Sequence, residues 1–97
     1  MNKYTELTKE LLSRLYMNFD GNDPIQSQAQ RLIVKTYHKI EKSENSLEKS
    51  LRILFNNLTR LERIKKLVVN YPNQEVLTEL KHLLKPQLVQ QPIKISD

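Results

Sequence analysis

The sequence contains no cysteine, no tryptophan and only one glycine, Gly21. The lack of cysteine excludes disulfide scaffolds and thiolate metal sites, and it is typical of proteins from a reducing compartment. One glycine cannot build a glycine-rich phosphate-binding loop. It also cannot supply the tight turns on which β-hairpins depend, so the composition predicts an all-α protein.

Long apolar runs are absent as well. The longest, such as Leu67 to Val69, are far too short to span a bilayer. The opening segment, MNKYTELTKELL, has no apolar core of a secretion signal. We therefore expect a soluble, cytoplasmic protein that associates with membranes only in part.

The chain does contain enough apolar material for one core. Leu, Ile, Val and Phe supply 30 of the 97 residues, which is above the range typical of disordered chains. A chain of this length forms one domain and leaves little room for a deep catalytic cleft with lids. The size therefore favours a binding or structural role over catalysis.

Apolar residues recur every three or four positions in four segments. This spacing predicts amphipathic helices at about residues 3–19, 24–43, 46–70 and 72–85. The third helix is the most regular, with an apolar seam of Leu47, Leu51, Leu54, Leu58 and Leu61. Short connections favour antiparallel neighbours. The sequence therefore predicts an antiparallel four-helix bundle over residues 1–85.

Polar residues mark where the two middle helices begin. Asp23 precedes Pro24 at the first helical position, and Gln26 follows three residues after Asp23. This is the arrangement of a capping box, with proline where its missing N–H does no harm. Asn45 and Glu48 repeat the spacing and predict the start of the third helix.

Prolines punctuate the last third of the chain. Pro72 predicts the break before the fourth helix and Pro86 predicts its end, because proline cannot continue the helical hydrogen-bond ladder. Residues 86–97, which include Pro92, are therefore predicted to form an extended, non-helical tail. Its apolar residues suit a strap that docks into a groove, although chain ends are often frayed. They are Leu88, Val89, Ile93 and Ile95.

The residues that could perform chemistry are few and scattered. His38 and His82 lie on different predicted helices, and neither has the spacing to a second ligand that a metal site needs. No serine sits in a nucleophile elbow. We expect no enzyme activity, no cofactor and no metal, and we expect both histidines at the surface.

Basic residues form rows on two predicted helices. The row on the second helix comprises Arg31, Lys35, Lys39 and Lys42, and the row on the third comprises Lys49, Arg52, Arg60 and Arg63, almost opposite the leucine seam. The net charge of +5 fits nucleic acid, an anionic membrane surface or an acidic protein interface as partner. Solvated faces of a bundle carry such rows as well.

The stretch LIVKTYHKIEKSENSLEKSLRILFNNL, from Leu32 to Leu58, resembles the enterocin A immunity type of pediocin-like bacteriocin immunity protein. The resemblance consists of an apolar and basic helix ending in KTYHKIEK, a short polar loop and a leucine-rich helix. The first helix, ELTKELLSRLY, and the fourth, NQEVLTELKHLL, fit the same layout, so the similarity covers about residues 3 to 85. The sequence departs from the better-known members after Asn56.

This resemblance implies a cytosolic four-helix bundle that protects a bacterium from a membrane-permeabilising peptide. Such proteins are thought to bind the complex of the peptide with its receptor, the mannose phosphotransferase permease, from the cytosolic side. Recognition in that family belongs to the C-terminal half. Carried over to this chain, it implies partner-binding residues Arg60, Arg63, Lys66, Lys81, Lys85, Leu88, Val89, Ile93, Lys94 and Ile95.

Two alternatives of other classes remain open at this point. The basic rows could serve a small nucleic-acid-binding regulator, although no aromatic residues are interleaved with them for stacking. The seam of the third helix could instead pair with another chain, as in a helical oligomerisation module. We expect a monomer in the main, with a dimer as the alternative, a peripheral contact with an anionic membrane surface, and no nucleic acid partner.

Overall fold

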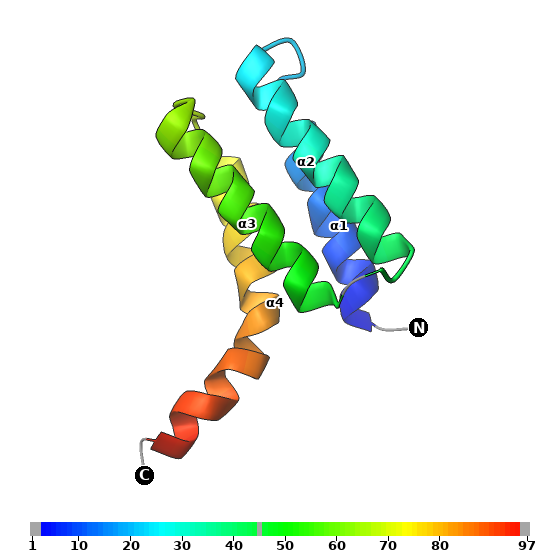
Figure 1. The fold of residues 1–97 in the computed structure, drawn as a ribbon, viewed down its shortest axis with the longest axis vertical. Coiled ribbons are helices and arrows are strands. Elements are labelled where there is room, and N and C mark those ends of the chain that lie inside the picture. Colours follow the sequence, from blue (N-terminus) through cyan, green and yellow to red (C-terminus); the bar gives the residue numbers. More distant parts are fainter. Residues whose placement is uncertain (1–2, 45, 96–97) are drawn as a thin grey trace.

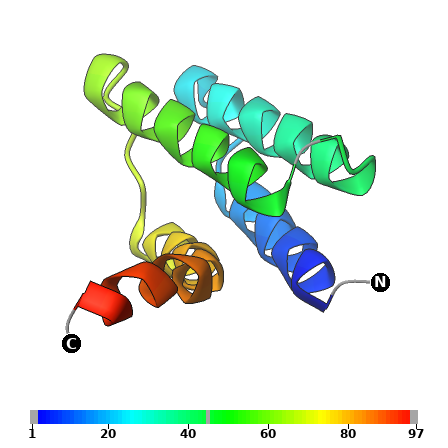
Figure 2. The same ribbon diagram turned by 60° about the horizontal axis from the view of Figure 1, so that its bottom comes forward.

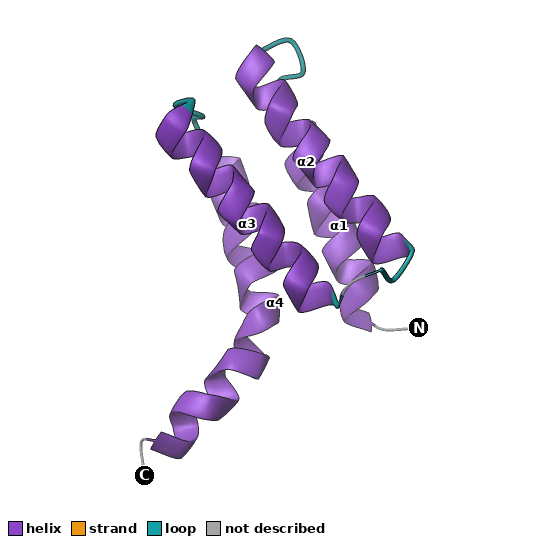
Figure 3. Ribbon diagram, in the orientation of Figure 1, coloured by secondary structure: helices purple, strands orange, loops and turns teal. Residues whose placement is uncertain are grey.

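The computed structural model describes residues 3–44 and 46–95, and from residue 85 onward it describes the backbone alone. Within these residues the chain forms four helices and no strand (Figures 1 and 3). The helices are α1 (Lys3–Asn18), α2 (Pro24–Glu41), α3 (Leu47–Ile64) and α4 (Tyr71–Ile95). The all-α prediction is confirmed.

The helices run alternately up and down and form two layers. Helices α2 and α3 make one layer, and α1 and α4 lie behind them (Figures 1 and 2). Helix α1 packs against both α2 and α4, and α2 also packs against α3. This is the antiparallel four-helix bundle predicted from the sequence.

All four helices contribute to one apolar core. Leu51, Leu54 and Leu58 of the predicted seam are buried in it. The remaining buried apolar residues are Leu11, Leu12, Leu15, Phe19, Ala29, Ile33, Ile40, Leu67, Val76, Leu80 and Leu84. Burial of these side chains is the main force that holds the bundle together.

Asp23 caps α2 as predicted, with one change to the expected box. The Asp23 carboxylate accepts a hydrogen bond from the Ile25 N–H at 2.9 Å. The Gln26 side chain donates to the same carboxylate at 3.1 Å, and its oxygen accepts from the N–H of Asp20 at 2.7 Å. Gln26 therefore ties the helix start to the preceding loop instead of reaching the backbone of Asp23.

Helix α3 is capped by Ser46. The Ser46 hydroxyl accepts from the Lys49 N–H at 3.1 Å, and α3 begins at Leu47. Asn45 itself lies outside the described residues. The predicted pair of Asn45 and Glu48 was therefore wrong by one position, because serine and asparagine are nearly equal as N-caps and both stand at this boundary.

The end of α2 is a Schellman motif that lacks glycine. Ser43 follows the helix with a φ of 55°. Its N–H donates to the Ile40 carbonyl at 3.1 Å, and the N–H of Glu44 donates to the Lys39 carbonyl at 3.1 Å. These two bonds satisfy carbonyls that a helix end leaves free, so α2 stops at Glu41, two residues before the predicted end.

Helix α3 ends at Ile64, whereas the sequence predicts about residue 70. Lys66 takes a left-handed conformation with a φ of 63°, and the N–H of Leu67 donates back to the Leu61 carbonyl at 3.1 Å. This reversal returns Leu67 to the core, whereas six more helical residues would run about 9 Å further. The predicted end was wrong because the apolar spacing continues beyond Ile64, and the sequence alone does not show the left-handed backbone at Lys66 that ends the helix.

Helix α4 continues to Ile95, so the backbone of residues 86–95 is helical rather than extended. Proline removes one hydrogen bond and bends a helix, but a bent helix can continue beyond it. Figures 1 and 2 show the last turns of α4 changing direction and projecting beyond the other helices. The predicted extended conformation is corrected in this segment, and residues 96 and 97 lie outside the described residues.

Candidate partner-binding surface

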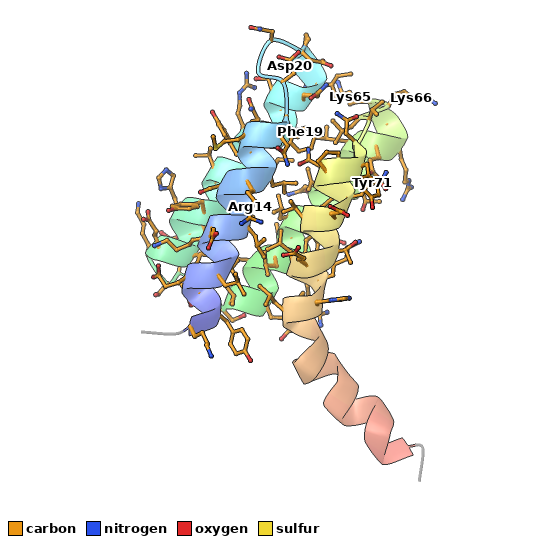
Figure 4. All side chains as sticks on the ribbon, turned by 180° about the vertical axis from the view of Figure 1, so that it is seen from behind. Arg14, Phe19, Asp20, Lys65, Lys66 and Tyr71 are labelled. Atoms are coloured by element: carbon orange, nitrogen blue, oxygen red, sulfur yellow. The ribbon has the colours of Figure 1, made fainter. Side chains whose placement is uncertain are left out.

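Three of the predicted partner-binding cations lie at one end of the bundle. Arg60 and Arg63 are exposed in the last turns of α3, and Lys66 is exposed in the connection that follows. Figure 4 shows Lys66 beside Lys65 at this end. The left-handed turn at Lys66 thus gathers cations from the helix and from the connection.

Exposed apolar side chains share this end of the molecule. Ile64, Val68 and Tyr71 are 64%, 66% and 71% exposed, although isoleucine and valine are among the residues most often buried. We call the combined region the corner surface; it comprises Arg60, Arg63, Ile64, Lys66, Val68 and Tyr71. Exposed apolar groups beside cations are typical of surfaces that meet a partner.

Acidic residues bound the corner surface on α4. Tyr71, Glu75 and Glu79 line a shallow hollow there. A side-chain hydrogen bond with Glu75 raises the pKa of Tyr71, and the negative charge of Glu75 raises it further because it opposes ionisation of the phenol. The surface therefore changes from basic on the α3 side to acidic on the α4 side.

Lys81 lies apart from the corner surface. Its ammonium nitrogen sits 5.7 Å from the centre of the Phe55 ring, a cation–π contact between α4 and α3. Ten residues separate Lys81 from Tyr71, which is about 15 Å along a helix. The structure therefore does not join Lys81 to Lys66 in one cluster.

The remaining predicted residues fall on the last turns of α4. Their backbone is helical and projects from the bundle (Figure 1). Their side chains lie outside the described part of the structure. These residues are Lys85, Leu88, Val89, Ile93, Lys94 and Ile95.

Both histidines are exposed, as predicted. His38 Nδ1 lies 3.5 Å from a Glu41 oxygen, and the His38 ring meets Tyr37 edge to face. Among the described residues, no group of three histidine, cysteine or acidic side chains is placed to hold a metal ion. Nothing pairs either histidine with a nucleophile in the part of the chain described.

Sequence reasoning missed an open apolar groove of about 350 Å³ between α1 and α2. Leu12 and Ile33 are its buried residues, and Tyr16, Met17 and Val34 are exposed along it. The available signal was the width of the apolar stripe on the first helix, where Tyr16 lies beside the core positions.

No helix in the described segments combines the length and the apolar character needed to cross a bilayer. Comparison of the chain with protein-family models, with curated proteins and with solved structures finds no match.

Proposed function

We propose that this protein is a non-enzymatic binding protein that confers immunity to a pediocin-like, pore-forming bacteriocin. It would bind the complex of the peptide with the mannose phosphotransferase permease from the cytosolic side of the membrane. The protein would be cytoplasmic, with a fraction held at the membrane through this partner. The proposal rests on the resemblance of residues 32 to 58 together with the four-helix layout.

One observation supports this reading above others. The resembling segment comprises the second half of α2, most of α3 and the polar loop between Glu41 and Leu47 that joins these two adjacent helices. The order of helix, loop and helix in this segment supports the proposal. The corner surface and the last turns of α4 then lie in the C-terminal half, where the resemblance implies that recognition occurs.

The test is protection in living cells. The gene is expressed in a sensitive Gram-positive strain, and growth is measured against a panel of pediocin-like peptides. We expect protection against at least one peptide and co-purification of the protein with the permease only when that peptide is present. If the protein is folded and abundant but protects against none of them, the proposal fails.

A charge-matched pair of variants then locates the surface. Replacing Arg60, Arg63 and Lys66 by glutamine should reduce protection strongly, because it removes the cations of the corner surface. Replacing Lys3, Arg14 and Arg31 by glutamine removes the same charge from exposed sites elsewhere and should leave protection intact. Equal loss in both variants would show that net charge, and not the corner surface, is what matters.

A further inference from the structure

A small, partly enclosed hollow of about 60 Å³ lies between α2 and α3. Its polar lining comes from Lys35, Thr36, Lys39, Ser50 and Asn57. A single water needs only about 10 to 15 Å³, so the hollow has room for several waters or for one oxyanion. None of the lining side chains is a carboxylate.

The two lysines of this hollow have no described counter-charge. No ion pair between described residues involves Lys35 or Lys39. The nearest acid on α2, Glu41, is engaged toward α1, where its carboxylate lies 3.7 Å from the Lys9 ammonium. Like charges four residues apart on a helix repel each other, so Lys35 and Lys39 present an uncompensated positive field.

Ser50 adds a hydrogen-bond donor at the floor of the hollow. It is 2% exposed, and its hydroxyl has no partner among the described residues. Thr36, which lines the same hollow, instead satisfies its hydroxyl by donating to the Leu32 carbonyl at 2.9 Å. A helical serine can donate to a carbonyl in the same way, but the Ser50 hydroxyl does not. It therefore remains a buried hydrogen-bond donor without a partner, in the same hollow as the two lysines.

We propose that the hollow between α2 and α3 binds a phosphate-bearing anion, with Lys35 and Lys39 as its cationic walls and the Ser50 hydroxyl as a buried donor. Ammonium and hydroxyl donors around a partly enclosed recess suit an oxyanion, because hydrogen bonds to charged groups are stronger than those between neutral groups. The phosphate can belong to a lipid headgroup or to a small soluble molecule. This inference does not depend on the proposed immunity function.

Two other buried side chains also lack partners, but they do not compete with this site. Thr8 and Asn73 are fully buried with unpaired polar atoms. Neither of them lines the hollow that contains Lys35 and Lys39. The combination of a recess, two free cations and a free donor is therefore the feature that indicates an anion.

The first experiment is a titration of the full chain with inorganic phosphate at constant ionic strength, followed by amide chemical shifts. We expect saturable shifts concentrated at Thr36, Ser50 and Asn57. Shifts spread evenly over all the basic residues would overturn the proposal, because they would indicate non-specific attraction.

Variants separate the site from general charge. Lys35→Gln with Lys39→Gln should abolish saturable phosphate binding. Lys42→Gln with Lys49→Gln removes the same charge from exposed positions outside the hollow and should weaken binding less than about 3-fold, through long-range attraction alone. Equal weakening by the two pairs would refute the site.

Ser50→Ala gives a test in which a structural role and a binding role move in opposite directions. Without phosphate, the thermal midpoint of Ser50→Ala should equal or exceed that of the parent, because a buried hydroxyl without a partner is removed. Phosphate affinity should fall about 10-fold or more, as expected for loss of a hydrogen bond to a charged group. Unchanged affinity would overturn the role of Ser50.

The source of the phosphate is decided with vesicles. Phosphatidylcholine vesicles are compared with vesicles that also contain phosphatidic acid, in the presence and absence of free phosphate. Binding to phosphatidic acid that free phosphate displaces supports a lipid headgroup, and binding of free phosphate alone supports a soluble ligand. Binding to neither overturns the proposal, as does tight binding to single-stranded nucleic acid without any binding of inorganic phosphate.

Discussion

At the scale of single residues, two positions adopt left-handed backbone without being glycine. Ser43 ends α2 with a φ of 55°, and Lys66 follows α3 with a φ of 63°. This conformation brings Cβ close to the following carbonyl oxygen, at about 1 to 2 kcal/mol per residue. The turn at Lys66 persists because burial of Leu67 stabilises the fold by more than the backbone strain costs. At Ser43, the two hydrogen bonds of the Schellman motif offset the strain in the same way.

Lys66→Gly should therefore stabilise the protein. Relief of the left-handed strain outweighs the greater flexibility of glycine in the unfolded chain, so the free energy of unfolding should rise by about 0.5 to 1 kcal/mol. Urea denaturation measures the change. The control is Lys65→Gly, where φ is −103° and no strain is relieved, so that variant should be no more stable than the parent. A destabilised Lys66→Gly would contradict the account of this turn.

The buried seam of α3 gives a prediction of the opposite sign. Leu54 and Leu58 are 1% and 3% exposed, so Leu54→Ala or Leu58→Ala should lower the free energy of unfolding by about 2 to 5 kcal/mol. Arg63→Ala, at an exposed site of the same helix, should change it by less than about 0.5 kcal/mol. Equal effects of the leucine and arginine variants in denaturant titrations would show that the seam is not buried in solution.

At the scale of elements, the last turns of α4 can be removed without touching the described core, which ends at Leu84. A chain that stops after Lys85 should keep one cooperative unfolding transition. It should also lose far-UV circular dichroism signal, because residues 86–95 are helical. An unchanged helical signal per molecule would instead support the extended tail that the prolines predict. Loss of cooperative unfolding would show that the last turns of α4 stabilise the bundle.

The same truncation bears on immunity. If the last turns of α4 contribute to recognition, the shortened protein should fold but protect poorly in the peptide challenge. Full protection would restrict the binding surface to residues before Pro86. Because folding and protection are measured separately, loss of one is not mistaken for loss of the other.

The existence and order of the helices could be predicted because their apolar spacing is regular and Asp23 and Pro24 mark a start unambiguously. The ends were harder to predict. The turn at Lys66 depends on one backbone conformation that lysine rarely adopts, and no residue type announces it. At Pro86 the predicted helix end came too early. The sequence shows that proline lacks a hydrogen-bond donor, but it does not show whether the helix continues beyond the bend.

The candidate surfaces were predictable only in part. The rows of cations on α2 and α3 follow from helical projection, and Arg60 and Arg63 are exposed as expected. The burial of Ser50 could not be predicted from the third helix alone, because it depends on the neighbouring helix. The hollow needs α2 and α3 side by side, and a single helix projection does not contain that information.

At the scale of the whole molecule, the seam that could have paired two chains is already occupied. Leu51, Leu54 and Leu58 are buried within one chain, so they are not available for a second copy. Sedimentation at low micromolar concentration should therefore show a monomer. A stable dimer would contradict this expectation, and its loss in a Met17→Gln variant would assign the contact to the apolar groove between α1 and α2.

The order in which the helices meet has a consequence for how the molecule opens. Helices α1, α2 and α3 pack as successive neighbours, whereas α4 packs chiefly against α1, far away in the sequence. Detachment of α4 would thus break mainly distant contacts and leave two local hairpins in place, so its amides should exchange with solvent hydrogen sooner than those of α2. A ligand bound at the protruding end of α4 would therefore act on the helix that we expect to detach first.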